Sequence, residues 1–290
     1  MYKIGRDLPA AKALEAVKRG ITTGISKLDE ATTGFQPGEL IVIGGCSSMG
    51  KSALMIDMVR AASREVPVLV FPIEEGALLF LQRLIYNLAQ ANFHVGQLEG
   101  LETPEALSAV QILESKHNIY IGESRTVVPA WRLKFPLPEG EAFINIEIAE
   151  AAKCGCKIVF LDYLGLVEYG AKTQREDLRL HAITRELKLL AVELKMTVVL
   201  LHQLKKEVAT RSDPTPNLND VRDAGQVINN ADKVILVHRP EYYDKKEELD
   251  IYGDHIEEAQ LIIAKQRAGP TGIIKVKFLP FCMSFVEEYL

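Results

Sequence analysis

The chain has 290 residues, of which 48% are hydrophobic and 25% charged, and its formal net charge is −5. This composition is typical of a globular protein with one or two domains, and the acidic balance excludes a surface coated with basic side chains for nucleic acid. No apolar run approaches the roughly 20 residues that cross a membrane, and the amino terminus lacks the apolar segment of a signal peptide. We therefore expect a cytoplasmic protein with no membrane partner.

Residues 1–20 carry a short helical pattern, with apolar side chains spaced three or four positions apart. The pattern ends at Gly20, a residue type that commonly follows the end of a helix. This apolar stripe is too small to form a domain, so we expect a linker-type helix that packs on another surface. Residues 21–290 are expected to form one domain, which the chain enters through a turn-rich stretch at 23–39.

From residue 40 onwards, apolar and β-branched runs alternate with helical patterns. The runs predict strands at Leu40–Gly44, Val68–Ile73, Lys157–Leu161, Thr197–Leu201 and Lys233–Val237. The helical patterns lie near residues 52–63, 77–92, 104–115, 141–153 and 176–195. A C-terminal β-hairpin is expected from Ala259–Gln266 and Ile273–Leu279. The rhythm predicts an α/β fold, with a mostly parallel, twisted sheet covered by helices on both faces.

A phosphate-binding loop directly follows the first expected strand. Residues 45–52 read GCSSMGKS and fit the pattern G-x-x-x-x-G-K-[ST]. In such P-loops the glycines let the backbone curl until N–H groups point at phosphate oxygens. Lys51 would reach the β- and γ-phosphates, and Ser52 would ligate Mg²⁺. The sequence predicts a nucleoside triphosphate site that includes Gly45, Cys46, Ser47, Ser48, Met49, Gly50, Lys51 and Ser52.

Carboxylates follow two further strands. Asp162 ends the strand at 157–161, which is the expected place of a carboxylate that ligates Mg²⁺ together with Ser52; the alternative is a simple turn residue. Glu74 and Glu75 follow the strand at 68–73. Carboxyl ends of parallel strands meet at one edge of a sheet, so these groups should lie beside the P-loop. Glu74 is the candidate base that orients water, and the alternative for Glu75 is an acidic residue at a helix N-terminus.

Polar residues also follow the strand at Thr197–Leu201. These residues, His202 and Gln203, are placed to contact the γ-phosphate and to report its loss to the segment that follows. That segment, from Lys205 to about Asn219, shows no regular pattern, and loops of this length are usually functional or disordered. Within residues 237–243, Arg239, Tyr242 and Tyr243 are further candidates to frame a nucleobase.

Taken in order, the motifs resemble the RecA-fold replicative DNA helicases of the DnaB type. The resemblance covers nearly all of residues 21–286. It rests on TGISKLD at 23–29, SSMGKS at 47–52, FPIEE at 71–75, DYLGL at 162–166, HQL at 202–204, NDVRDAG at 219–225 and AKQRAGPTG at 264–272. The chain departs from the family pattern at Pro72, Gly165 and Lys206, and residues 124–140 match nothing in it.

The resemblance implies an ATP- and Mg²⁺-dependent ring, hexameric in the family's manner, that moves along single-stranded DNA. Lys51 and Glu74 then act in hydrolysis, and Gln203 matches the family's γ-phosphate sensor. Lys265 and Arg267 match finger residues that reach the nucleotide of the neighbouring subunit, where an arginine stabilises transition-state charge. A solvated basic strand pair is the alternative for these two cations.

The resemblance also implies a DNA contact and protein partners. Arg222, Asp223 and Gly225 match the loop that contacts DNA phosphates in the ring channel, and Lys205 is a further candidate. A surface pair with a neighbouring aspartate is the alternative for Arg222. The family's N-terminal collar domain, which docks primase, has no counterpart here, so we expect a minimal, phage-like form or a truncated one. A helicase loader or primase is an expected partner.

A second functional class stays open. The protein could be a RecA-fold regulator or adaptor that binds ATP as a switch, without processive unwinding. The unmatched residues 124–140 and the absent collar domain favour this alternative. Strand displacement on a forked DNA substrate distinguishes the two functions.

Overall fold

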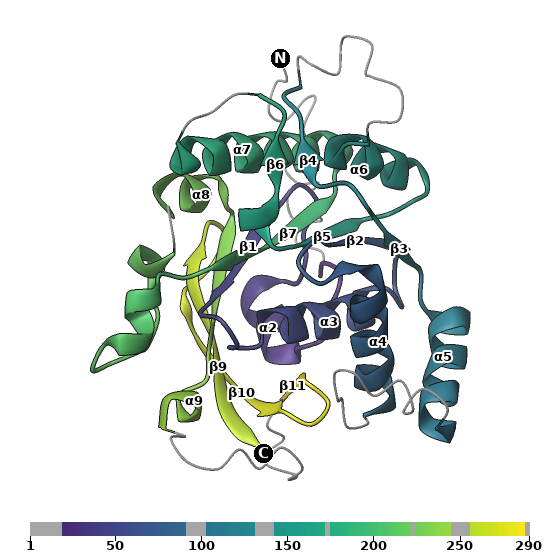
Figure 1. The fold of residues 1–290 in the computed structure, drawn as a ribbon, viewed down its shortest axis with the longest axis vertical. Helices are drawn as coiled ribbons and strands as arrows, with labels where there is room; N and C mark the ends of the chain where they lie inside the picture. The colour runs from purple at the N-terminus through teal and green to yellow at the C-terminus, as the bar shows by residue number, and fades with distance from the viewer. Residues whose placement is uncertain are drawn as a thin grey trace, which may run out of the picture.

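A single nine-stranded sheet runs through the centre of the molecule (Figure 1). The structure, a computed structural model, describes residues 19–90, 103–130, 142–171, 175–221, 224–244 and 256–287. The strand order is β11-β10-β9-β8-β1-β7-β5-β2-β3. The six parallel strands are β1 (Leu40–Gly45), β2 (Val68–Pro72), β3 (Ile119–Ile121), β5 (Ile158–Asp162), β7 (Thr197–Gln203) and β8 (Lys233–His238). The antiparallel strands are β9 (Glu257–Gln266), β10 (Gly272–Leu279) and β11 (Ser284–Glu287).

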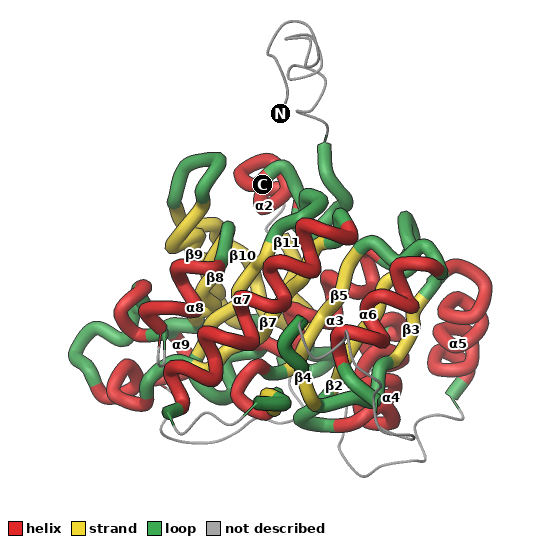
Figure 2. Tube along the Cα trace, turned by 90° about the horizontal axis from the view of Figure 1, so that it is seen from above, coloured by secondary structure: helices red, strands yellow, loops and turns green. Residues whose placement is uncertain are grey.

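Helices cover both faces of the sheet, which is why the central parallel strands are buried at almost every position. One face carries α2 (Ser26–Thr32), α3 (Lys51–Ala62) and α4 (Gly76–Ala89), with α5 (Pro104–Lys116) packed beside α4. The other face carries α6 (Ile144–Lys153), α7 (Glu176–Leu194) and α8 (Ala224–Asn230). Figure 2 shows α7 lying across the middle strands. The predicted α/β layers are confirmed.

Short elements complete the fold outside the main layers. A small parallel pair is formed by β4 (Thr126–Val127) and β6 (Glu168–Tyr169). The other short elements are the helix α9 (Glu241–Asp244) and the 3₁₀ helices η3 (Leu164–Leu166), η4 (Lys206–Thr210) and η5 (Leu218–Asp220). None of the described helices is both long and apolar enough to span a membrane.

The stretch expected to be turn-rich contains a helix instead. Residues 26–32 form α2, and its Asp29 accepts hydrogen bonds from Thr23 N at 2.8 Å and from Thr22 Oγ1 at 2.5 Å. The helix is only seven residues long, too short for a periodic apolar pattern to be recognised. The helix expected within residues 1–20 lies outside the described residues, apart from its last two positions.

A buried carboxylate fixes the last strand of the sheet to α3. Asp57 accepts hydrogen bonds from Phe285 N at 2.6 Å, Ser284 Oγ at 2.8 Å and Asn87 Nδ2 at 2.9 Å. Burial raises the pKa of Asp57. The Phe285 ring in turn packs so tightly against Gly50 that an added Cβ there would meet it at 2.9 Å. The C-terminal strands therefore support the P-loop directly.

Candidate nucleotide-binding site

The P-loop lies at the carboxyl edge of the sheet, between β1 and α3. Ser48 and Gly50 adopt left-handed backbone angles, with φ of +63° and +91°, and α3 begins directly afterwards at Lys51. The first N–H groups of α3 therefore face a cleft of about 810 Å³. The cleft is lined by Ser47, Ser48, Gly50, Lys51, Ser52, Ala53, Glu74, Glu75, Leu79, Arg83, Asp162, Tyr163, Gln203, Arg239, Phe278, Pro280 and Met283.

Two long polar side chains contact the P-loop from inside the cleft. Lys51 Nζ donates a hydrogen bond to the carbonyl oxygen of Cys46 at 3.0 Å, and burial lowers the pKa of Lys51. Gln203, the last residue of β7, donates from Nε2 to Ser47 Oγ at 2.7 Å. The structure therefore brings the predicted phosphate contacts together with the predicted γ-phosphate sensor.

The predicted metal ligands also lie together. Ser52 Oγ donates a hydrogen bond to Asp162 Oδ2 at 2.5 Å. Asp162 is fully buried, and burial raises its pKa although the Ser52 bond opposes this. Its other oxygen, Oδ1, has no hydrogen-bond partner among the described residues. An unpaired buried carboxylate oxygen beside a hydroxyl fits Mg²⁺, which takes oxygen ligands and needs only one or two from protein.

The two carboxylates after β2 lie in different environments. Glu74 N donates to Asp162 O at 3.0 Å, and its exposed side chain lines the cleft. Glu75 is turned inward, its side chain is 8% exposed, and Arg83 Nη1 lies 2.7 Å from its Oε2. Burial raises the pKa of Glu75 to about 7, outweighing the attraction of Arg83. The ion pair with Arg83 engages Glu75, which leaves Glu74 as the carboxylate that is exposed to the cleft.

Replacing Glu75 by glutamine is expected to remove a pH dependence of stability. The native pKa of about 7 lies above the usual value of 4.5, so the folded chain binds more protons between these values. The free energy of unfolding should therefore fall as the pH rises from about 4.5 to 7 in the parent, and less steeply in Glu75→Gln. Urea unfolding across this range measures both slopes. Equal slopes would contradict the raised pKa.

The predicted finger residues lie away from this cleft, at the amino edge of the sheet. Lys265 Nζ donates to the carbonyl oxygens of Ala231, at 2.7 Å, and of Ile228. Arg267 donates to Asn229 O at 2.7 Å, and its Nη1 lies 3.2 Å from Asp232 Oδ1. Both cations thus bind carbonyls at the C-terminal end of α8, a position that favours positive charge. Neither residue lines the cleft of its own chain.

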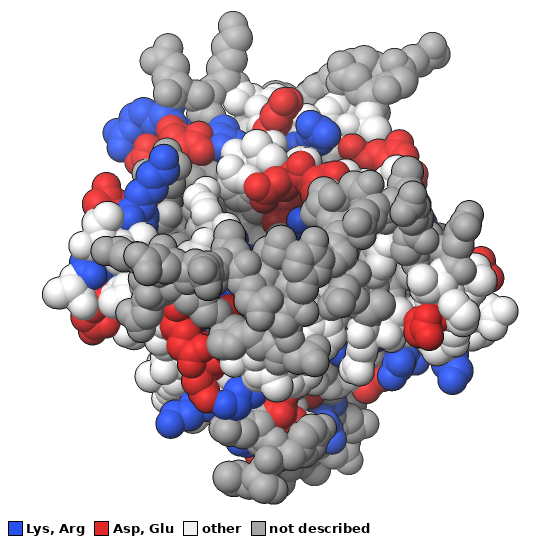
Figure 3. Space-filling view, turned by 60° about the horizontal axis from the view of Figure 1, so that its bottom comes forward, with Lys and Arg blue, Asp and Glu red and all other residues white. Residues whose placement is uncertain are grey.

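The predicted DNA contacts are only partly described. Arg222 and Asp223 lie outside the described residues, whereas Gly225 is exposed in the first turn of α8. Lys205 follows β7, and its Nζ donates to Asn219 O at 2.7 Å. On the face in Figure 3, basic and acidic side chains of the described residues are interspersed, without a continuous field of either sign.

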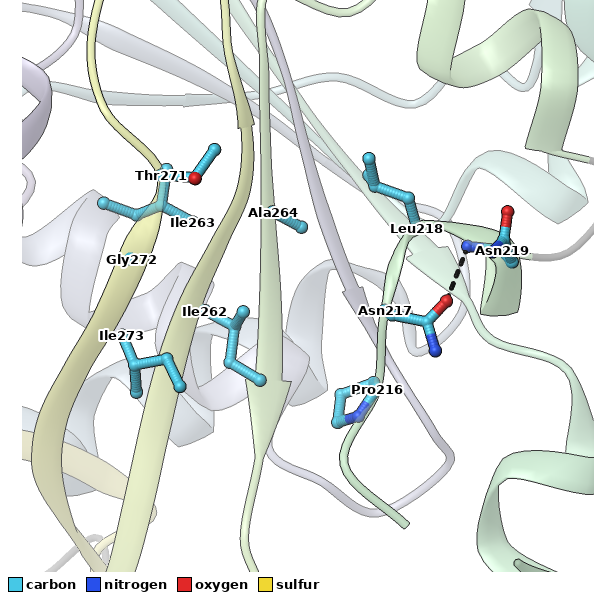
Figure 4. A pocket seen from close by; sticks show the side chains of 10 residues that line it. All are labelled: Pro216, Asn217, Leu218, Asn219, Ile262, Ile263, Ala264, Thr271, Gly272 and Ile273. Carbon is cyan, nitrogen blue, oxygen red and sulfur yellow. Dashed lines mark hydrogen bonds between the residues drawn. The ribbon is translucent and has the colours of Figure 1, made fainter. Parts of the chain in front are cut away.

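A second hollow, of about 500 Å³, lies between η5 and the β9–β10 hairpin (Figure 4). Pro216 and Leu218 form one side of it, and Ile262, Ala264 and Ile273 form the other. None of its lining residues is charged. This hollow therefore lacks the cationic and carboxylate side chains that the cleft presents.

Phe278, Pro280 and Met283 line the cleft although no sequence pattern predicted them. They come from β10 and the turn that follows it, more than 200 residues from the P-loop. Arg239, one of the three residues predicted to frame a nucleobase, follows β8 at the same edge and also lines the cleft. Its Cζ lies 4.1 Å from the centre of the Phe278 ring.

Known proteins resemble the chain over most of its length. The sequence model of the DnaB-like helicase C-terminal domain matches residues 20–287. The replicative DNA helicase DnaB of Haemophilus influenzae is 32% identical over 266 residues, which are 89% of this chain and 53% of that protein. The DnaB of Leifsonia xyli subsp. xyli is 30% identical over 295 residues, or 97% of this chain and 59% of that protein. The chain thus spans about half the length of these relatives.

Solved structures share the fold over nearly the whole chain. A DnaB-like replicative helicase, described with its interactions with primase, has a TM-score of 0.81 at 26% identity and covers 98% of this chain and 68% of its own. A second solved structure, of an ATPase domain alone, has the same TM-score at 25% identity, covering 97% of this chain and 96% of its own. The sheet and its helices form a RecA-like ATPase fold. The chain belongs to the family of DnaB-like helicase C-terminal domains.

Proposed function

We propose that residues 21–290 form the ATPase unit of a ring-shaped, hexameric helicase that moves along single-stranded DNA during replication. One observation carries the proposal: the P-loop cleft and the cations Lys265 and Arg267 lie at opposite edges of the same sheet. A chain built this way holds two halves of different sites. In a ring, the cations of one copy can complete the cleft of the next. Relatives named replicative DNA helicase DnaB support the reaction class.

Within one cleft, different side chains would take different roles in ATP hydrolysis. Ser52 and Asp162 would hold Mg²⁺, which when bound supplies positive charge to the β- and γ-phosphate oxygens. Lys51 would donate hydrogen bonds to the same phosphates. Glu74 would accept a hydrogen bond from the attacking water and so orient it. Gln203 would contact the γ-phosphate and lose that contact when phosphate leaves.

The neighbouring copy would supply the remaining charge. Arg267 would exchange its contacts with Asp232 and Asn229 for the γ-phosphate of the adjacent cleft, where it stabilises transition-state charge. The exchange costs little because the Arg267 side chain is 51% exposed, and exposed ion pairs contribute about 0–1 kcal/mol. Lys265 would assist from the same strand end. Hydrolysis is then a property of the interface between copies.

DNA contact would follow from the same strand ends. Gln203 ends β7 and Lys205 lies two positions further along the chain, so a change at the γ-phosphate would reach the proposed DNA-contacting segment from the end of this strand. Arg222, Asp223 and Gly225 would contact DNA phosphates, which position the strand without reading its sequence. A few such contacts per copy, repeated around a ring, would bind DNA without requiring a broadly basic surface, which agrees with the negative net charge of the chain.

The proposed partners follow from the same assembly. Residues 1–20 would pack on the adjacent copy as a linker helix. A primase is a candidate partner because a solved relative is described together with its interactions with primase. A helicase loader is a second candidate.

The test is ATPase activity measured with and without single-stranded DNA, on a sample shown to be hexameric by analytical ultracentrifugation. We expect DNA to stimulate hydrolysis, because Lys205, a proposed DNA contact, follows the proposed γ-phosphate contact Gln203 by two positions. A hexamer that hydrolyses ATP at the same rate with and without single-stranded DNA would contradict the proposal. Stimulated hydrolysis without strand displacement on a forked substrate would instead support an ATP-binding regulator.

A further inference from the structure

A buried ion pair closes one side of the nucleotide cleft. Arg239, just after β8, is 6% exposed, and Glu257, the first residue of β9, is 4% exposed. Arg239 donates to Glu257 Oε2 from Nε at 2.8 Å and from Nη2 at 2.6 Å. Buried ion pairs contribute little net free energy of folding compared with apolar packing. The contacts that this pair positions are therefore a better guide to its role than its contribution to stability.

The third contact of the guanidinium reaches the P-loop. Arg239 Nη1 donates to the carbonyl oxygen of Ser48 at 2.9 Å. Ser48 is the loop residue held at φ +63°, a conformation that non-glycine residues keep only where their surroundings enforce it. In a trans peptide the carbonyl and the next N–H point in opposite directions. The bond therefore turns Met49 N–H into the loop, where it faces Cys46 O at 3.4 Å.

We infer that Glu257 is a positioning residue of the nucleotide site, which acts by holding Arg239 against the Ser48 carbonyl. The inference rests on the proposed function, in which the P-loop binds a nucleoside triphosphate. Arg239 cannot give up its proton, so without a buried counter-charge its guanidinium is driven toward the open cleft. Ser48 O then loses its donor, and the loop loses the backbone shape that presents N–H groups to phosphate.

The test compares Glu257→Gln with the parent in MgATP binding and steady-state hydrolysis, using the full chain. Loss of one charge-assisted contact should weaken binding about tenfold. A loss of pre-organised binding raises KM with little change in kcat. We therefore expect KM to rise about tenfold and kcat to change by less than about twofold. A fall in kcat at unchanged KM would overturn the inference.

The matched control removes a comparable ion pair from the other end of β8. Lys233 Nζ lies 2.6 Å from Glu39 Oε2, and the Lys233 side chain is 3% exposed. Glu39→Gln should lower the thermal midpoint of unfolding as much as Glu257→Gln does, yet leave MgATP affinity at the parent value. Equal losses of affinity in both variants would show a general loosening of the fold and overturn the inference.

A second variant keeps the inference testable if Glu257→Gln does not fold. Replacing the pair by apolar side chains, Arg239→Met with Glu257→Leu, should preserve stability because buried ion pairs often exchange for apolar packing without loss. It still lacks the donor to Ser48, so its MgATP affinity should fall about tenfold, as in Glu257→Gln. Parent affinity in this variant would overturn the inference alone. Absence of MgATP binding by the parent would overturn the proposed function, and the inference with it.

Discussion

Glu74→Gln is expected to lower kcat for ATP hydrolysis by about 10²–10⁴-fold, the usual contribution of a positioned base. The Glu74 side chain lies exposed in the cleft that Asp162 and Ser52, the proposed metal ligands, also line. Glutamine keeps its size but cannot take a proton from water. MgATP affinity should stay within about twofold, because the phosphate contacts of the P-loop are untouched. Rapid-quench hydrolysis and equilibrium nucleotide binding measure the two effects.

The adjacent carboxylate provides the matched control. Glu75 also lines the cleft, but its side chain is only 8% exposed and is paired with Arg83, so Glu75→Gln should retain most of the hydrolysis rate. The two variants differ by one position and carry the same chemical change. A large loss in Glu75→Gln with little loss in Glu74→Gln would reverse the assignment of the base.

Arg267→Ala is expected to reduce hydrolysis by about 10³-fold or more while leaving MgATP binding nearly intact, as for an arginine finger supplied by another subunit. In its own chain Arg267 contacts Asp232 and Asn229 at the amino edge of the sheet. It therefore adds nothing to its own P-loop cleft. Hydrolysis and nucleotide binding, measured on the same assembled sample, separate the two effects.

Mixing experiments test whether Arg267 acts between copies. In mixed rings, an Arg267→Ala subunit with an intact P-loop can sit beside a Lys51→Ala subunit with an intact finger. We expect this interface to hydrolyse ATP, so mixing two inactive variants should restore partial activity. Lys275→Ala is the matched control, because it removes an exposed cation from the neighbouring strand β10. Absence of restoration in verified mixed rings would refute action between copies.

The features that could be predicted from the sequence are those carried by contiguous residues. The P-loop at 45–52 is a local motif, and its glycines and lysine have one role wherever a strand precedes them and a helix follows. Asp162 and Glu74 could be placed because carboxyl ends of parallel strands converge at one edge. In the structure Asp162 accepts a hydrogen bond from Ser52, and the backbone N–H of Glu74 donates to the carbonyl oxygen of Asp162. The catalytic roles of these residues stay predictions.

Other features depend on residues far apart in the chain. The hydrogen bond between Asp57 and Ser284 joins residues 227 positions apart, so no local pattern predicts it. Strand β11 has only four residues, too few for a recognisable pattern. The short helix α2 was missed because a seven-residue segment shows too little periodicity. Arg239 and Glu257 are separated by 18 positions and meet only because β8 and β9 pair antiparallel.

The local motifs and the alternation of apolar runs were enough to predict a P-loop, its metal ligands and a parallel α/β sheet, because each depends on neighbouring residues or on strand polarity. Only the tertiary structure decided that the cations proposed to complete a neighbouring cleft lie at the opposite edge of the sheet from the P-loop. It placed Lys265 and Arg267 on the carbonyls of α8, away from their own P-loop. It also joined Arg239 to Ser48 across the cleft. Such contacts arise from long-range packing, which local residue patterns do not encode.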